Sequence, residues 1–331
     1  MNVSLAAIPV ARNPVYTRAV HVESAPAALS RRRALTLSPA AFRRVALAAV
    51  GMLVLIVASG ATVRLTGSGL GCPHWPTCTT QHAAPRGYHA DIEFSNRVVS
   101  AFTVLATLLL GVGAWRTRGL GRRGQLLAAG VFAGTLAQAP LGAVTVYYDL
   151  NPYLVISHLL LSLTVLGLGV LALLEASRLV RGGEAALPAL ARWGGAALLA
   201  AAAVLVVSGT LSTAAGAYPG SSGAKVAPRL WVFHSAVYWH VRAVAVFGVV
   251  FLGLAVWARR EQLGWLVRGC AGLLAILLVQ MGVGELQYRT YGTVPWWLVV
   301  LHVVAAAALF AWTVGVVARL WRPVATTPDR H

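Results

Sequence analysis

Long apolar runs alternate with short polar segments between residues 45 and 317. A bilayer core of about 30 Å needs roughly 20 apolar residues in each helix that spans it. Runs of about that length, bounded by charged residues or by proline and glycine clusters, occur eight times. They occupy residues 45–63, 93–114, 125–147, 153–174, 194–213, 231–257, 267–288 and 296–317. The pattern therefore predicts an all-α integral membrane protein with eight transmembrane helices.

The composition agrees with a membrane protein and excludes an ordinary soluble domain. Of the 331 residues, 58% are hydrophobic and 11% are charged, whereas soluble domains carry about 25% charged residues. The net charge of +18 is scattered in short clusters between the apolar runs, which argues against nucleic-acid binding. Residues 1–41 and 319–331 are predicted to be tails. The N-terminal one is basic and lacks apolar periodicity, so we expect it to be disordered.

The arginine clusters predict the orientation, because Lys and Arg near the ends of spans are retained in the cytoplasm. With the N-terminus inside, 20 of the 27 basic residues lie on the cytoplasmic side and five on the other, while Arg97 and Arg242 fall within spans. We therefore expect a multi-pass protein of the plasma membrane with both termini in the cytoplasm. The loop 64–92 would face the extracytoplasmic side.

Two of the three cysteines lie in that outer loop, in the segment GCPHWPTC. An oxidising compartment favours a disulfide between Cys72 and Cys78, which would close a small loop. A metal site that includes His74 and a pair of free thiols are the alternatives. Cys270, at the start of the seventh span, is expected to be a packing residue.

The two halves of the chain share a plan, which indicates an internal duplication. SGATVRLTGSG at 59–69 ends the first span, and SGTLSTAAGAY at 208–218 ends the fifth. LAQAPLGAVTVYY at 136–148 and LVQMGVGELQY at 278–288 carry Gln and a following Gly at matched spacing. Because an even number of spans separates the repeats, both insert in the same direction. We expect two pseudo-symmetric four-helix bundles, at 42–192 and 193–318.

Three histidines within the spans occupy related places in this repeat. His158 and His302 are 144 residues apart, and His240 precedes His302 by 62 residues. The residue 62 positions before His158 is Asn96. His240 and His302 lie at matching depth, about two turns or roughly 10 Å from the outer ends of their helices, which predicts axial ligation of a haem iron. A hydrogen-bonded packing role is the alternative, and His234 competes with His240 but points about 240° away around the helix.

Charged residues near the outer ends of the spans are further candidates. Glu93 and Arg97 are four residues apart on one helix face, beside Asn96. The carboxylate would handle protons, and the guanidinium would hold a haem propionate. A simple interfacial ion pair is the alternative. Arg242 is a second candidate for a propionate, and Glu285 is a second carboxylate that needs a partner.

Taken together, these residues resemble the haem A synthase family over nearly all of 45–317. The matching pieces are TGSGLGCPHWPTC, the Glu-x-x-x-Arg of IEFSNR, the Gln and Gly of the third span, NPYLVISH and VPWWLVVLH. The resemblance implies eight helices in two bundles. It also implies oxidation of the C8 methyl of haem O to a formyl group through successive hydroxylations, which gives haem A for terminal oxidases.

The resemblance also implies roles for individual residues. The C-terminal bundle would hold a b-type haem between His240 and His302, which relays electrons. The N-terminal bundle would hold the substrate haem O, with His158 as its ligand and Glu93 near the reacting methyl. The family commonly has Glu-x-x-His-Arg where this chain has Asn96 before the arginine. Because an amide is a poor iron ligand, we expect one strong ligand and an open or water-occupied sixth position.

The expected partners follow from this function. They are haem O, the enzyme that produces it, an electron donor that the sequence does not identify, and the terminal oxidase during its assembly. The family associates the pair Cys72 and Cys78 with structure or redox exchange. The alternative functions are a di-haem cytochrome b that only transfers electrons and a transporter that handles haem.

Overall fold

A computed structural model describes residues 36–72, 74, 77–78, 87–222, 226 and 229–325 of the chain. Leu37–His331 forms one compact unit. Eight helices within the described residues are long and apolar enough to cross a membrane. They are α2 (Pro39–Leu65), α3 (Tyr88–Arg116), α4 (Arg122–Tyr147), α5 (Pro152–Arg181), α6 (Ala189–Ala215), α7 (Phe233–Arg260), α8 (Gly264–Arg289) and α9 (Trp296–Trp321). The predicted all-α fold with eight spans is confirmed.

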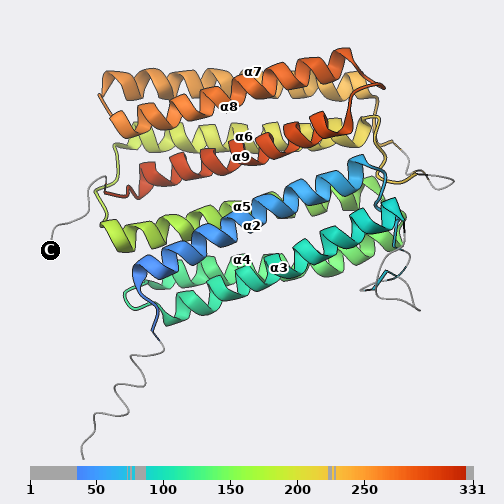
Figure 1. Ribbon diagram of the computed structural model, residues 1–331. Coiled ribbons are helices and arrows are strands. Elements are labelled where there is room, and N and C mark those ends of the chain that lie inside the picture. The colour runs from blue at the N-terminus through green and yellow to red at the C-terminus, as the bar shows by residue number, and fades with distance from the viewer. Residues whose placement is uncertain are drawn as a thin grey trace, which may run out of the picture. The chain divides into compact units, whose positions relative to one another are not determined.

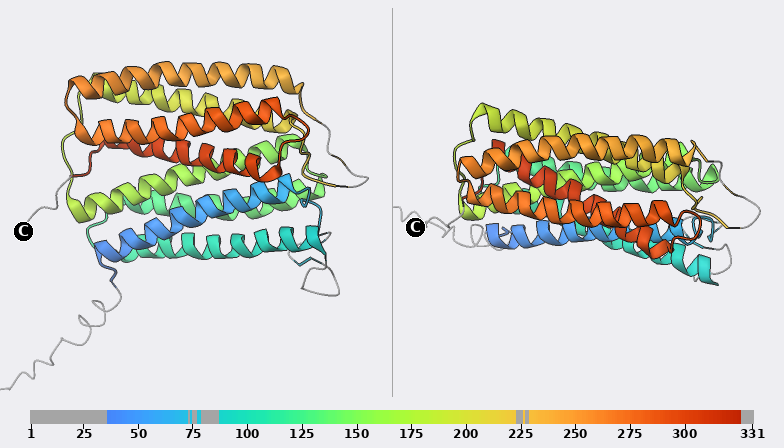
Figure 2. Two further views of the ribbon diagram at one scale, coloured as in Figure 1. Left: turned by 45° about the horizontal axis from the view of Figure 1, so that its top comes forward. Right: turned by 90° about the horizontal axis from the view of Figure 1, so that it is seen from above.

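The helices pack as two bundles of four. In the first, α2 contacts α3, α3 contacts α4, α4 contacts α5, and α5 closes the ring against α2. The same order of contacts closes the second bundle through α6, α7, α8 and α9. The bundles meet where α2 and α5 pack on α9 and where α5 packs on α6. Figures 1 and 2 show both groups of helices running side by side.

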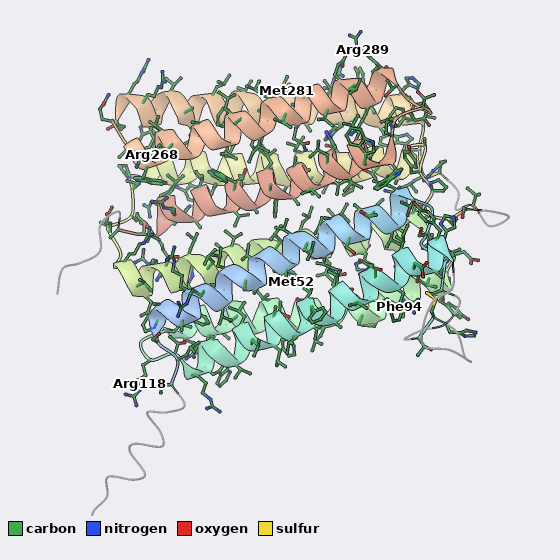
Figure 3. The ribbon with its side chains drawn as sticks, in the orientation of Figure 1. Met52, Phe94, Arg118, Arg268, Met281 and Arg289 are labelled. Atoms are coloured by element: carbon green, nitrogen blue, oxygen red, sulfur yellow. A yellow bond between two sulfur atoms is a disulfide. The ribbon has the colours of Figure 1, made fainter. Side chains whose placement is uncertain are left out.

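Small and aliphatic side chains at helical spacing form the bundle interiors. In α2, the buried residues Phe42, Ala46, Ala49, Leu53 and Val57 lie on one stripe. Each bundle has its own cluster of buried residues, built on this plan. Large apolar side chains also point outward all along the helices, as Met281 does in Figure 3. Such outward apolar surface suits contact with lipid chains.

The helices extend beyond the apolar runs that predicted them. The Ser38 hydroxyl accepts a hydrogen bond from the backbone N–H of Ala41 at 3.2 Å, and Pro39 occupies the first turn. Helix α2 therefore begins three residues before residue 42, where the first bundle was expected to start. At the other end, α9 continues to Trp321, beyond residue 318. Residues 1–35 and 326–331 lie outside the described part.

The two ends of the helices differ in charge. Arg118 and Arg268 lie at one end in Figure 3, whereas Phe94 and Arg289 lie at the other. The arginines that the sequence analysis placed together, in the segments that join α3 to α4, α5 to α6 and α7 to α8, share the first of these ends. The second end carries the disulfide loop and the longest connections. We call it the outer end, after the orientation that the sequence predicts.

Candidate functional site

His240 and His302 both lie half-buried in the second bundle, each against a glycine of the neighbouring helix. A Cβ atom added to Gly209 of α6 would lie 3.1 Å from the Cε1 atom of His240. A Cβ atom added to Gly284 of α8 would lie 3.3 Å from the Cε1 atom of His302. The bare backbone at these glycines lets each imidazole pack directly on a helix.

The two imidazoles differ in their hydrogen bonds. The Ser208 hydroxyl bonds the Nδ1 atom of His240 at 3.0 Å, which holds the ring and would leave its Nε2 atom to bind a metal. The Nδ1 atom of His302 is buried and has no hydrogen-bond partner. Among the described residues, no group of three or more His, Cys, Asp or Glu side chains could hold a metal ion. Two imidazoles are a donor set that would fit a haem iron.

The first bundle repeats this geometry with one change of residue. A Cβ atom added to Gly142 of α4 would lie 3.4 Å from the Nε2 atom of His158. Asn96 of α3 is the first-bundle equivalent of His240. A Cβ atom added to Gly60 of α2 would lie 4.0 Å from the Oδ1 atom of Asn96. The Ser59 hydroxyl donates a hydrogen bond to that Oδ1 atom at 2.8 Å. Ser59 and Gly60 of α2 therefore contact the amide of Asn96. Ser208 and Gly209 of α6 contact the imidazole of His240 in the same way.

Two glutamines extend the repeat on the helices that carry Gly142 and Gly284. The Nε2 atom of Gln138 donates to the backbone oxygen of His158 at 3.2 Å and to the Ser162 hydroxyl at 2.7 Å. Gln280 is buried at the equivalent place in α8. The Oε1 atoms of both glutamines are buried without a hydrogen-bond partner.

Glu93 joins α3 to the outer loop. Its Oε2 atom accepts a hydrogen bond from the backbone N–H of Cys72 at 2.8 Å, and its Oε1 atom pairs with Arg97 at 2.6 Å. Arg97 also donates to the backbone oxygens of His74 at 2.7 Å and Thr77 at 2.9 Å. The pair therefore holds the loop in place. The guanidinium of Arg97 points to loop carbonyls, whereas a haem propionate was the partner suggested by the sequence.

The predicted disulfide between Cys72 and Cys78 is confirmed, and both residues are buried. Ala90 and Phe94 of α3 pack around it. Its yellow sulfur atoms lie beside Phe94 in Figure 3. Cys270 is a buried free cysteine, which agrees with the packing role expected for it.

Comparison with known proteins identifies the family. Residues 43–91 and 86–314 match the family model COX15-CtaA, described as cytochrome oxidase assembly protein. The chain belongs to this family. The resemblance to haem A synthases on which the sequence analysis relied is thereby confirmed.

Individual relatives match over shorter stretches. The heme A synthase of Lysinibacillus sphaericus (strain C3-41) is 37% identical over 119 residues, which is 35% of this chain and 38% of the relative. The heme A synthase of Staphylococcus haemolyticus is 35% identical over 117 residues, 34% of this chain and 38% of the relative. The heme A synthase of Symbiobacterium thermophilum is 37% identical over 107 residues, which is 32% of this chain and 35% of the relative. The chain thus aligns with little more than a third of the length of these relatives.

Other residues that the sequence pointed to have partners outside the four repeat-related positions Asn96, His158, His240 and His302. Arg242 is exposed, and its guanidinium lies 3.2 Å from the centre of the Tyr238 ring, where it makes a cation–π contact. Glu285 finds its partner in Arg289, at 2.5 Å. His234 is exposed among aromatic rings, with its ring 5.7 Å from that of Tyr288. His21, His82 and His331 lie outside the described residues.

His89 links the outer segments of the two bundles. Its Nδ1 atom bonds the Ser68 hydroxyl at 2.9 Å, and its Nε2 atom lies 3.4 Å from the Ser222 hydroxyl. The backbone of Gly69 also donates to the oxygen of Gly220 at 2.8 Å. The outer segments of the two bundles are thus joined by backbone and side-chain contacts.

The sequence analysis missed the role of the four glycines. Its repeat alignments contained Ser59-Gly60 and Ser208-Gly209, and they noted a Gly after each glutamine. A shared pattern would have revealed them. In each of the four pairs of consecutive helices, the first helix carries a glycine near its outer end and the second carries the histidine or asparagine that faces it.

Proposed function

We propose that the protein is a haem A synthase that oxidises the C8 methyl of haem O to a formyl group by successive hydroxylations. The observation that carries the proposal is the fourfold arrangement described above. Three imidazoles and one amide occupy equivalent positions, and each faces a glycine on the neighbouring helix. The names of the relatives support the same activity.

In the second bundle, His240 and His302 would hold a b-type haem. A porphyrin iron with two imidazole ligands supplies one-electron transfer when bound. Ser208 orients the imidazole of His240 through Nδ1. The surrounding apolar helices keep water from the pair and tune the potential of the group they hold.

In the first bundle, His158 would be the one strong ligand of the substrate haem O. Asn96 faces it with an amide whose oxygen already accepts a hydrogen bond from Ser59. An amide held in this way competes poorly for iron. The side of the substrate that faces Asn96 is therefore left without a strong protein ligand.

Glu93 is proposed to exchange a proton near the reacting methyl group. Both of its carboxylate oxygens accept hydrogen bonds, from the backbone of Cys72 and from Arg97. A proton taken up by the carboxylate removes its charge, which weakens the hydrogen bonds from Cys72 and Arg97. Such a change would loosen the contact between α3 and the disulfide loop.

The proposed orientation places both termini in the cytoplasm and the disulfide loop outside. The gathering of arginines at the end opposite this loop supports it. The proposed partners are an enzyme that supplies haem O, a membrane electron donor, and a terminal oxidase that receives haem A.

Haem extraction tests the proposed activity. The protein is expressed together with a source of haem O, and the extracted haems are separated by chromatography. A haem A synthase yields a hydroxylated or formylated haem, and His158→Ala should abolish that product. Unmodified haem O alone, from wild-type protein that has bound it, would refute the activity. That result would favour a cytochrome or a transporter.

A further inference from the structure

Two arginines converge in a pocket between the bundles, at the outer end. Arg64 comes from the last turn of α2, and Arg229 from the segment that precedes α7. The start of α5, from Pro152 to Leu159, and the end of α6 around Thr213 complete the wall. The pocket therefore draws on both bundles, and it involves none of the four repeat-related positions.

Three guanidinium nitrogen atoms of these two arginines have no acceptor. Arg64 donates through one terminal nitrogen to the backbone oxygen of Thr213 at 2.7 Å, but its Nε atom is buried without a partner. The Nε and Nη1 atoms of Arg229 are also buried without partners. Neither arginine takes part in the ion pairs that the described residues form.

Such an arrangement is costly for the protein alone. Two guanidinium groups of like charge repel each other, and a buried charge ordinarily has a counter-ion. Burial lowers the pKa of Arg229, while the nearby Tyr291 acts in the opposite direction. An anion between the two arginines would satisfy the free N–H groups and remove the repulsion.

The shape of the pocket limits the kind of anion. Its room is about 20 Å³, about the space of one water molecule. It therefore admits the oxygen atoms of an anionic group but not a whole large ligand. Val155, Ile156 and Leu159 form an apolar wall along about one turn of α5. An oxyanion attached to an apolar body matches both features.

We infer that Arg64 and Arg229 form an oxyanion site that binds the anionic group of an amphiphile between the two bundles. Phosphate and carboxylate share this chemistry. A phosphate would come from an anionic phospholipid of the bilayer, and a carboxylate from a haem propionate. The propionate source rests on the proposed function, whereas the phospholipid source does not.

The test uses the full-length protein in detergent, as wild type, Arg229→Gln and Arg64→Gln. Arg289→Gln is the matched control, because Arg289 lies at the same end of the helices but is exposed and paired with Glu285. Arg229→Gln is the primary variant, since Arg64 also ties α2 to α6 through Thr213.

Two binding measurements separate the sources. Native mass spectrometry compares retention of phosphatidylglycerol with that of phosphatidylcholine carrying the same chains. Optical titration compares iron protoporphyrin with its dimethyl ester. If the source is a phospholipid, Arg229→Gln should weaken phosphatidylglycerol binding roughly tenfold and leave phosphatidylcholine unchanged. If the source is a propionate, Arg229→Gln should bind iron protoporphyrin as weakly as the wild type binds the dimethyl ester.

Unchanged binding in both measurements, for both arginine variants, would overturn the site. An equal loss in Arg289→Gln would overturn it as well, because general surface charge would then explain the effect. Failure of the wild type to bind any haem would count against the proposed function. The phospholipid measurement would then decide the oxyanion site alone.

Discussion

Replacement of Gly209 by alanine should displace the His240 imidazole without removing any ligand atom. The added methyl carbon would lie 3.1 Å from Cε1, 3.6 Å from Nδ1 and 3.8 Å from Nε2 of the ring. Carbon atoms pack best at about 3.5–4.0 Å, so the ring must move by at least about 0.4 Å. Ser208 holds the ring at Nδ1, so that movement strains or breaks the 3.0 Å hydrogen bond.

The energetic cost has two opposing parts. Overpacking of this kind costs about 1–3 kcal/mol, whereas alanine in place of glycine within a helix stabilises by about 1 kcal/mol. The net change in the free energy of unfolding should be a loss of about 0–2 kcal/mol. Gly194→Ala is the matched control in the same helix, because an added Cβ there meets nothing within 4 Å. That control should be unchanged or slightly more stable.

Optical spectroscopy and thermal unfolding of the haem-loaded proteins measure the outcome. Gly209→Ala should lose part of the low-spin haem signal and unfold at a lower temperature than Gly194→Ala. A full low-spin spectrum together with the same unfolding temperature in both variants would refute the reasoning. The imidazole would then not depend on the bare backbone of α6.

Two further predictions concern the first bundle. Asn96→His should place an imidazole beside Ser59, as His240 lies beside Ser208, and should add a second low-spin signal in protein loaded with haem O. Asn96→Ala is the control. Identical spectra of the two variants would count against the equivalence of Asn96 and His240. Glu93→Gln should weaken the charge-assisted contacts to the loop by about 1–3 kcal/mol. Its disulfide should then be reduced and alkylated faster than that of wild type, and an unchanged rate of alkylation would show that Glu93 does not hold the loop.

Features that repeat at regular spacing along the chain could be predicted from the sequence. The eight spans follow from runs of apolar residues whose length matches the bilayer. The equivalence of His158 and His302, and of Asn96 and His240, follows from constant separations between repeats. Both inferences use only local composition and distance along the chain, which a sequence contains in full.

Features that depend on contacts between distant segments could not be predicted. The guanidinium of Arg97 binds carbonyls of a loop about 20 residues earlier, and its direction depends on how that loop folds. The pocket around Arg64 and Arg229 joins segments 165 residues apart, and both residues appeared only as outer-side charges in the sequence. The helices also extend past the apolar runs that marked them, because capping residues such as Ser38 lie outside those runs.

Paramagnetic resonance of the purified protein, beside His240→Ala and His302→Ala, tests the central claim most directly. The account predicts a low-spin ferric signal of an iron with two imidazole ligands in wild type, and loss of that signal in each variant. His234→Ala should keep it, because that exposed imidazole lies in an aromatic cluster away from Gly209 and Gly284. A wild-type signal that persists in either His240→Ala or His302→Ala would contradict the account.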